Sequence, residues 1–194
     1  MKIMSINAGS SSLKFSLFNM DTKEVLLSGL FERIGIEGSC YTLEYGEYKI
    51  KNEALMETHL DAVKILMDKL LELKIVNSLE EIDGIGHRIV HGGAIYKESV
   101  VVTDKVLDDI IALSDLAPLH NPAHAMCIKA FREVLPNTPM VVVFDTAFHQ
   151  TIEKDRFLYP VPYNWYTDYQ VRKYGAHGTS HRYVAKKLQE EIEE

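Results

Sequence analysis

Three polar residues lie at or near the carboxyl ends of apolar segments, where their side chains could bind an anion together. Asn7 and Asp145 each directly follow an apolar run, and Arg88 lies near the end of another. Ligands of open α/β sheets bind outside the carboxyl ends of the strands. A guanidinium can hold a carboxylate or phosphate through two hydrogen bonds, and a carboxylate there suits Mg²⁺ or the orientation of a nucleophile. The alternatives are a surface ion pair for Arg88 and a turn cap for Asp145.

A second candidate anion site is a turn near the N-terminus. The segment Asn7-Ala8-Gly9-Ser10 separates two runs with strand character, which predicts a tight hairpin. Because its tip lacks bulky side chains, its N–H groups and the hydroxyls of Ser10 and Ser12 could approach phosphate oxygens, while Lys14 supplies charge. The spacing differs from GxxxxGK[ST], and a strand rather than a helix follows. An ordinary serine-rich hairpin is the alternative.

Six of the eight histidines form pairs four residues apart: His87 and His91, His120 and His124, and His177 and His181. A zinc site on these pairs is disfavoured, because none carries the HExxH glutamate and no cysteine pair completes a ligand set. Single roles fit better. His120, ahead of Asn-Pro, and His177, beside a glycine, could donate to developing negative charge.

Composition limits the class of protein. The chain has 194 residues, is 46% hydrophobic and carries a formal net charge of -7, so it can bury a sizeable core. The acidic balance, without a basic block, argues against nucleic acid and an anionic membrane surface as partners. Two distant cysteines give no disulfide framework, which fits a cytoplasmic location. No apolar stretch approaches the length of a membrane span.

Periodicity predicts the elements that would hold these residues. Alternating apolar residues to about residue 52 predict antiparallel strands, with Lys2–Ile6 ending before Asn7. Helical spacing follows over Leu55–Leu73, then a strand over Ile82–Val90 and a helix capped by Thr103.

The second half of the chain predicts helices around one buried strand. Asn121 is expected to cap a helix that has Pro122 as its first residue and Met126 among its buried positions. Met140–Phe144 is a β-branched run typical of a fully buried parallel strand. A helix from Ser180 closes the chain, and together the segments predict an α/β fold with a mixed sheet covered by helices.

With these residues collected, the chain closely resembles the acetate kinase family, of the acetate and sugar kinase, Hsp70 and actin superfamily. The segments that carry the resemblance are INAGSSSLKFSLF (6–18), GHRIVHGG (86–93), LAPLHNP (116–122), VFDTAFHQT (143–151) and YGAHGTSHRYV (174–184). They run in order through the whole chain. The resemblance implies a ribonuclease H-like, actin-like ATPase domain with N-terminal antiparallel hairpins, and Mg²⁺-dependent, reversible phosphoryl transfer between ATP and acetate, giving ADP and acetyl phosphate.

The resemblance also assigns roles to matching residues. Asp145, Arg88, His177 and His120 are the implied catalytic residues, with Arg88 holding acetate or the transferring phosphoryl group. Asn7, Ser10, Ser12 and Lys14 are the implied ATP and phosphate ligands, with Asn7 near Mg²⁺ as well. Val90, Leu119 and Ala176 are the implied neighbours of the acetate methyl group.

Two departures from the family qualify this expectation. Many members have an aromatic residue where this chain has Ala176, so the acyl pocket is expected to be larger and to tolerate propionate. The family is also about twice as long, so residues 1–194 are expected to form one N-terminal domain without the ATP-binding second domain and most of the family's homodimer interface. Little or no activity is expected from the chain alone. A propionate or butyrate kinase fragment and a non-catalytic anion-binding module remain alternatives.

Overall fold

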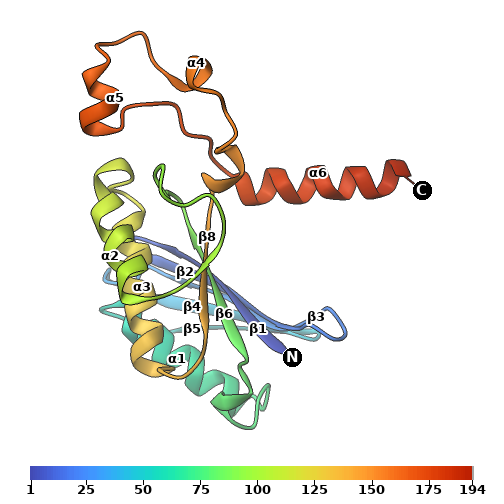
Figure 1. Cartoon of the computed structure of the whole chain (residues 1–194). Helices are drawn as coiled ribbons and strands as arrows, with labels where there is room; N and C mark the ends of the chain where they lie inside the picture. Colours follow the sequence, from blue (N-terminus) through green and yellow to red (C-terminus); the bar gives the residue numbers. More distant parts are fainter. Residues whose placement is uncertain (194) are drawn as a thin grey trace.

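The computed structural model describes residues 1–193 and is a mixed α/β structure with one sheet (Figure 1). The strands are β1 (Lys2–Gly9), β2 (Ser12–Asn19), β3 (Glu24–Glu32), β4 (Cys40–Tyr45), β5 (Tyr48–Glu53), β6 (Gly84–Ile89), β7 (Val100–Val101) and β8 (Met140–Phe144). The α-helices are α1 (His59–Glu72), α2 (Asp104–Ala112), α3 (Asn121–Val134), α4 (Lys154–Phe157), α5 (Asn164–Tyr169) and α6 (Gly178–Glu193). Short 3₁₀ turns cover Leu79–Glu81, Leu113–Leu116 and Ala147–His149.

The eight strands are ordered β5-β4-β3-β2-β1-β6-β8-β7. Strands β1 to β5 form an antiparallel meander, and β6 and β8 join it in parallel with β1, as expected. The carboxyl ends of β1, β6 and β8 therefore meet at one edge of the sheet. This arrangement confirms the predicted mixed sheet with N-terminal hairpins.

Strand β1 is longer than predicted. It continues to Gly9, which pairs with Ser12, so the hairpin turn contains Ser10 and Ser11 alone. Asn7 consequently lies within the strand and not in the turn. The alternation of buried residues continues through Ala8, and this periodicity should have outweighed the turn preference of Asn-Ala-Gly.

Helices α1, α2 and α3 cover one face of the sheet, and the main core lies between them (Figure 1). Helix α1 begins four residues later than expected, because Thr58 and Asp61 form a capping box that fixes its first turn. Leu55 is therefore outside the helix and 83% exposed. Met126 was expected to be buried but is 51% exposed, since it faces away from the sheet on α3.

The predicted cap of α3 is also wrong. His120, not Asn121, is the residue before the helix, and its side chain makes no capping hydrogen bond. Asn121 is fully buried and directs its amide elsewhere. A residue with a strong capping preference was thus used for a tertiary contact, which the local sequence does not reveal.

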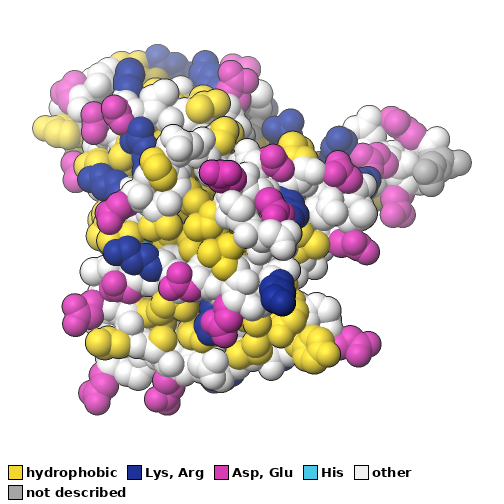
Figure 2. Space-filling view, turned by 90° about the horizontal axis from the view of Figure 1, so that it is seen from below, with side chains coloured by type: hydrophobic (Ala, Val, Ile, Leu, Met, Phe, Trp, Pro, Cys, Tyr) yellow, Lys and Arg dark blue, Asp and Glu magenta, His cyan; other side chains and the backbone are white. Residues whose placement is uncertain are grey.

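The other face of the sheet has little cover in the described part of the chain. Val141 and Val143 of β8 are half-buried, so the strand is parallel as predicted but not buried on both faces. Helix α6 packs against the 3₁₀ turn at Ala147–His149 through its first turns and then projects from the body (Figures 1 and 2). Its apolar side chains are exposed: Tyr183, Val184, Leu188 and Ile192. In residues 1–193, the helices are all too short or too polar to cross a membrane.

His87 is a polar residue inside this core. It lies on β6 with its ring edge against Phe131 of α3, and its Nε2 atom is buried without a hydrogen-bond partner in the described chain. Burial lowers the pKa of His87 from 6.5 to about 3, with a smaller contribution from the nearby His124. Between about pH 6.5 and pH 3, His87 is therefore neutral in the folded protein, whereas the same side chain becomes protonated in the unfolded chain.

We predict that replacing His87 by leucine reduces the loss of stability in acid. Below pH 6.5 the unfolded state takes up a proton that the folded state excludes, so His87 lowers stability as pH falls from 6.5 towards 3. Between pH 7 and pH 5 this penalty amounts to about 2 kcal/mol. Urea unfolding of the wild-type chain and His87→Leu at both pH values measures it. An equal loss of stability in both proteins would show that His87 protonates in the folded state.

Candidate anion-binding site

Asn7, Lys14 and Arg88 form a row across the uncovered face of the sheet. Asn7 pairs directly with Lys14 of β2, and both side chains are exposed. Ile6 pairs with His87, so the next residues on the two parallel strands, Asn7 and Arg88, lie side by side. The strand register thus brings an amide and two cations from distant segments onto one surface, as the sequence predicted for Asn7 and Arg88.

The Arg88 guanidinium joins the candidate residues directly. Its Nε donates to Asp145 Oδ1 at 3.2 Å and Oδ2 at 3.1 Å, and its Nη2 donates to Oδ2 at 2.6 Å. Nη1 donates to Asn7 Oδ1 at 3.4 Å. The carboxylate is 3% exposed and the guanidinium 36%, so Asp145 is the buried partner and Arg88 the one that reaches solvent. These hydrogen bonds with Asp145 raise the pKa of Arg88, which keeps its positive charge at the surface of the site.

His177 completes this cluster. Arg88 Nη2 donates to His177 Nδ1 at 3.4 Å, and the same ring atom lies 3.9 Å from Asp145 Oδ2. Because Arg88 has hydrogens to give and no acceptor, Nδ1 must accept, and the ring proton is placed on Nε2. The ring is 69% exposed, so this N–H can reach a ligand. His177 has a positive φ of 54°, a strained conformation for a residue with a side chain, and such strain often occurs at functional sites.

The start of α6 anchors His177 to Asp145. The Gly178 N–H donates to the Asp145 carbonyl at 2.8 Å, and Thr179 Oγ1 donates to Asp145 Oδ1 at 3.5 Å. A Cβ on Gly178 would lie 2.3 Å from that carbonyl oxygen, so this position has room for glycine alone. Sequence reasoning missed both residues, although the spacing of Gly-Thr-Ser after His177 at a helix start was a usable signal.

A second group of predicted residues lines a pocket of about 520 Å³ at the edge of the sheet. The hairpin residues Ser10 and Ser12 form one wall, and Leu119 and His120 form another beside the first turn of α3. The positive end of a helix dipole favours an anion there, although His120 is not held by a cap contact. The predicted phosphate-binding turn and His120 therefore line the same pocket. Within residues 1–193 they are not joined by hydrogen bonds in the way that Arg88, Asp145 and His177 are.

The predicted acyl-pocket residues are dispersed around these two groups. Val90 directly follows β6, two residues after Arg88, and Ala176 directly precedes His177. Leu119 lies in the edge pocket and is 78% exposed. Their assembly into one pocket for a methyl group remains a prediction.

Two buried residues behind the site were not predicted to have a role there. Asn121 Oδ1 accepts from the His91 N–H at 3.3 Å, while its Nδ2 donates to the His91 carbonyl at 3.0 Å and the Ile110 carbonyl at 3.3 Å. It thereby connects the segment after Arg88 to the helix start beside His120. His124 is buried one turn further along α3, and burial lowers its pKa to about 4, assisted by His120 and Arg88.

The candidate site offers a divalent cation only a few oxygen ligands from the described residues. Residues 1–193 contain no group of three or more His, Cys, Asp or Glu side chains that could hold a metal ion. Asn7 and Asp145 supply oxygen atoms at the site, and both accept from Arg88. This set is compatible with Mg²⁺, because Mg²⁺ usually keeps several waters and binds one or two protein oxygens together with substrate phosphates.

A protein-family model described as "Acetokinase family" matches residues 2–194 of this chain. The chain belongs to the acetokinase family. Among curated relatives, the acetate kinase of Anoxybacillus flavithermus is 56% identical over 189 residues, which are 97% of this chain and 48% of the relative. The chain therefore spans about half the length of the curated relatives it matches.

Solved structures of acetokinases share the fold. Porphyromonas gingivalis acetate kinase superposes with a TM-score of 0.94 and 39% identity, covering 98% of this chain and 49% of that one. A propionate kinase from Francisella tularensis gives a TM-score of 0.93 with 40% identity, covering 100% of this chain and 49% of that one. These matches confirm the predicted actin-like ATPase fold.

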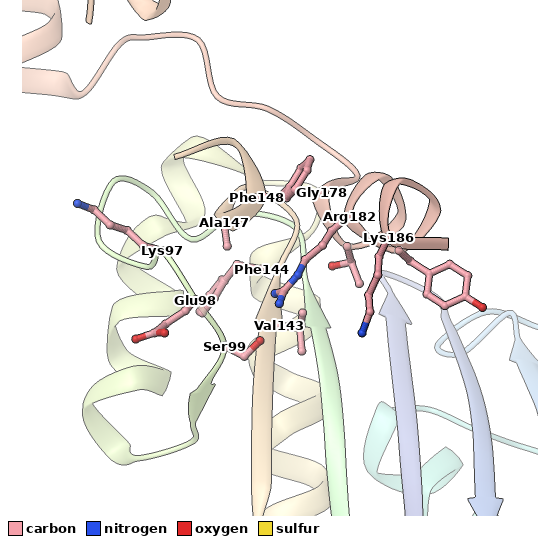
Figure 3. A pocket seen from close by; sticks show the side chains of 12 residues that line it. Lys97, Glu98, Ser99, Val143, Phe144, Ala147, Phe148, Gly178, Arg182 and Lys186 are labelled. Carbon is pink, nitrogen blue, oxygen red and sulfur yellow. The ribbon is translucent and has the colours of Figure 1, made fainter. Parts of the chain in front are cut away.

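A further cavity of about 390 Å³ lies on the other side of Gly178 and Thr179, between β8 and α6 (Figure 3). Its floor is apolar and includes Val143 and Phe144, while Arg182 and Lys186 extend over it from α6 (Figure 3). It adjoins the exposed apolar side chains of α6. In this acetokinase chain, the surface beside the candidate site is thus apolar with a cationic rim.

We predict that Gly178→Ala disrupts the site and destabilises the fold. The added methyl group would overlap the Asp145 carbonyl, and we expect a loss of at least about 2 kcal/mol in the free energy of unfolding. Gly86→Ala is a matched control, because its nearest atom would lie 4.0 Å from the new Cβ. Urea unfolding of both variants tests this. Equal stabilities of the two variants would contradict the tight packing of α6 on Asp145.

Proposed function

We propose that this chain is the N-terminal, acetate-handling half of an acetate kinase, which transfers a phosphoryl group reversibly between ATP and acetate. The observation that supports this most strongly is the Arg88 cluster. Asn7, Asp145 and His177 all contact one guanidinium at the carboxyl ends of neighbouring strands. Acetate kinases also account for the curated relatives described above.

The proposed chemistry requires charge and orientation more than covalent help. Acetate is already ionised, so it can attack a phosphoryl group without a strong base. Arg88 would hold the carboxylate or the transferring group, because its guanidinium is charged and partly exposed. The Nε2–H of His177 and the ring of His120 would donate to the equatorial oxygens as negative charge spreads over them. Asp145 keeps Arg88 in place from beneath.

ATP and Mg²⁺ are the implied co-substrate and cofactor. The phosphates would bind at the hairpin tip, near Ser10, Ser12 and Lys14, which present hydroxyl groups and one cation. Mg²⁺ would be held by the phosphates with help from Asn7, and when bound it would neutralise phosphate charge.

The remaining half of the enzyme is the main proposed partner. We infer that the second half of the family's length packs against the cavity beneath α6 and the exposed apolar side chains of that helix, since large apolar patches usually mark interfaces. That half would supply the adenine site and most of a homodimer interface. The two cysteines, both within the described residues, form no disulfide, which agrees with the proposed location in the reducing cytoplasm. Little or no turnover is therefore expected from residues 1–194 alone.

The first test is acyl phosphate formation, trapped with hydroxylamine, by the chain alone and by the chain joined to the second half of the Anoxybacillus flavithermus relative. We predict that the joined protein forms acyl phosphate and that residues 1–194 by themselves do not. In the joined protein, Arg88→Ala should lower kcat/KM by at least about 100-fold, because the charge that acts on the transition state is removed. Arg132→Ala is the control, since Arg132 of α3 pairs with the exposed Asp104 at the start of α2 and contacts none of the candidate site residues in the described chain.

Two outcomes would contradict the proposal. Turnover by residues 1–194 alone, abolished by Arg88→Ala, would show that the half-chain is self-sufficient. A folded, inactive joined protein would instead favour a non-catalytic anion-binding module.

We predict that the acyl pocket accepts propionate and that Ala176→Phe narrows it. One methylene group changes transition-state binding by about 1–3 kcal/mol, so Ala176→Phe should raise the ratio of acetate to propionate kcat/KM by about tenfold. The similarity to a propionate kinase structure is consistent with a permissive pocket. Competition between the two acids in the joined protein measures the ratio. An unchanged ratio would place Ala176 outside the acyl pocket.

A further inference from the structure

The tip of the first hairpin has donors that the rest of the protein does not use. Gly9 and Ser12 form the last pair of the two strands, so the turn consists of Ser10 and Ser11. In the described chain, neither the Ser10 N–H nor the Ser11 N–H donates to a protein acceptor. Ser10 also lines the edge pocket of about 520 Å³. The tip therefore presents two unpaired N–H groups, and the residue that carries one of them, Ser10, lines the edge pocket.

Two carbonyl groups at this tip, those of Gly9 and Ser11, in contrast accept hydrogen bonds from outside the hairpin. His59 Nε2 lies 2.8 Å from the Gly9 carbonyl oxygen, and the Ile34 N–H donates to the Ser11 carbonyl at 3.0 Å. Both anchoring residues are buried, His59 with 5% and Ile34 with 4% of its surface exposed. Since a carbonyl can only accept, His59 must carry its ring hydrogen on Nε2.

The direction of these bonds matters for an anion. The Gly9–Ser10 peptide is trans, so its N–H points opposite to its carbonyl. A carbonyl held by His59 therefore turns the Ser10 N–H away from His59 and removes a partial negative charge from the ligand side. The Ser10 N–H oriented in this way is followed in the chain by the unpaired Ser11 N–H, and successive N–H groups in a turn can form an anion-binding concavity. The Ser12 hydroxyl lies close by, because a Cβ on Gly9 would be 2.7 Å from Ser12 Oγ.

His59 is well placed to fix the turn. It is the first residue of α1 and lies between the two residues of the capping box, Thr58 and Asp61, and α1 packs on both β2 and α3. Its backbone is consequently held by helix and core together. A hydrogen bond from such a rigid position can select one orientation of the Gly9–Ser10 peptide.

We propose that His59 is a positioning residue for a phosphate-binding hairpin tip: it holds the Gly9 carbonyl so that the Ser10 N–H faces a polyphosphate ligand. The inference rests on the proposed function, in which that ligand is the phosphate end of a nucleotide. His59 itself does not contact the ligand.

The test is a titration of ¹⁵N-labelled residues 1–194 with inorganic triphosphate, following the Ser10 and Ser11 amide signals. His59→Leu removes the donor while keeping an apolar side chain in the buried position, and His59→Gln retains an N–H donor at similar reach. We expect the dissociation constant to rise by about tenfold or more for His59→Leu, and to stay within about threefold of wild type for His59→Gln. Urea unfolding selects conditions in which all three proteins are fully folded.

A purely structural His59 would change the unfolding curve but leave the affinity of the folded protein intact. Equal dissociation constants for the wild-type chain and His59→Leu would overturn the inference, and so would an absence of Ser10 shifts in the wild-type chain. Neither result decides the proposed function, because the hydroxylamine assay with Arg88→Ala does not depend on His59. If that assay fails while the triphosphate titration gives the expected result, the hairpin tip binds phosphate but the proposed kinase reaction is wrong.

Discussion

The ion pair between Arg88 and Asp145 is the interaction on which the site depends. A carboxylate that is 3% exposed requires a partner, because burial of an unpaired charge costs several kcal/mol. That partner comes from the neighbouring parallel strand, where Arg88 pairs with Val143, two residues before Asp145. The register of β6 and β8 therefore sets the reach of the pair. The register of β1 and β6 then places Asn7 against the same guanidinium.

The contrast between the two faces of the sheet explains why the site is open. Helices α1, α2 and α3 cover the apolar face, which receives the alternate residues of every central strand. The opposite face has Asn7, Lys14 and Arg88 in one row, with half-buried valines beside them. Asn7 and Lys14 are exposed and Arg88 is partly exposed beside His177, while the curated relatives are about twice as long as this chain. The open face and the exposed side of α6 are thus consistent with one half of a cleft whose other half lies in the remaining length of the family.

Much of this could be predicted from periodicity, and the errors have specific physical causes. The hairpins, α1, β8 and the clustering of Asn7, Arg88 and Asp145 followed from alternation and from the ends of apolar runs. Local preference misled at Asn121, whose amide satisfies buried backbone groups of His91 and Ile110 instead of capping α3. It also misled at Asn7, where pairing with Lys14 extended the strand through turn-forming residues. The contacts of Gly178 with Asp145 and of His59 with Gly9 join distant segments. The Gly-Thr-Ser sequence after His177 was a local signal for the first contact, and the sequence around His59 held none for the second.

The histidines around the site have two different roles, since two are buried and neutral and two make hydrogen bonds through a ring nitrogen. His87 and His124 are kept neutral by burial, so neither adds a positive charge behind Arg88 at neutral pH. His59 and His177 are used through single ring nitrogens, one donating to a carbonyl and one accepting from Arg88. The net charge of the chain is -7, yet the site presents Arg88, Lys14 and unpaired N–H groups. An anion that approaches this acidic protein is therefore attracted to the site, where the cations and the unpaired N–H groups lie close together. The buried carboxylate of Asp145 repels it little, because that carboxylate is already paired with Arg88.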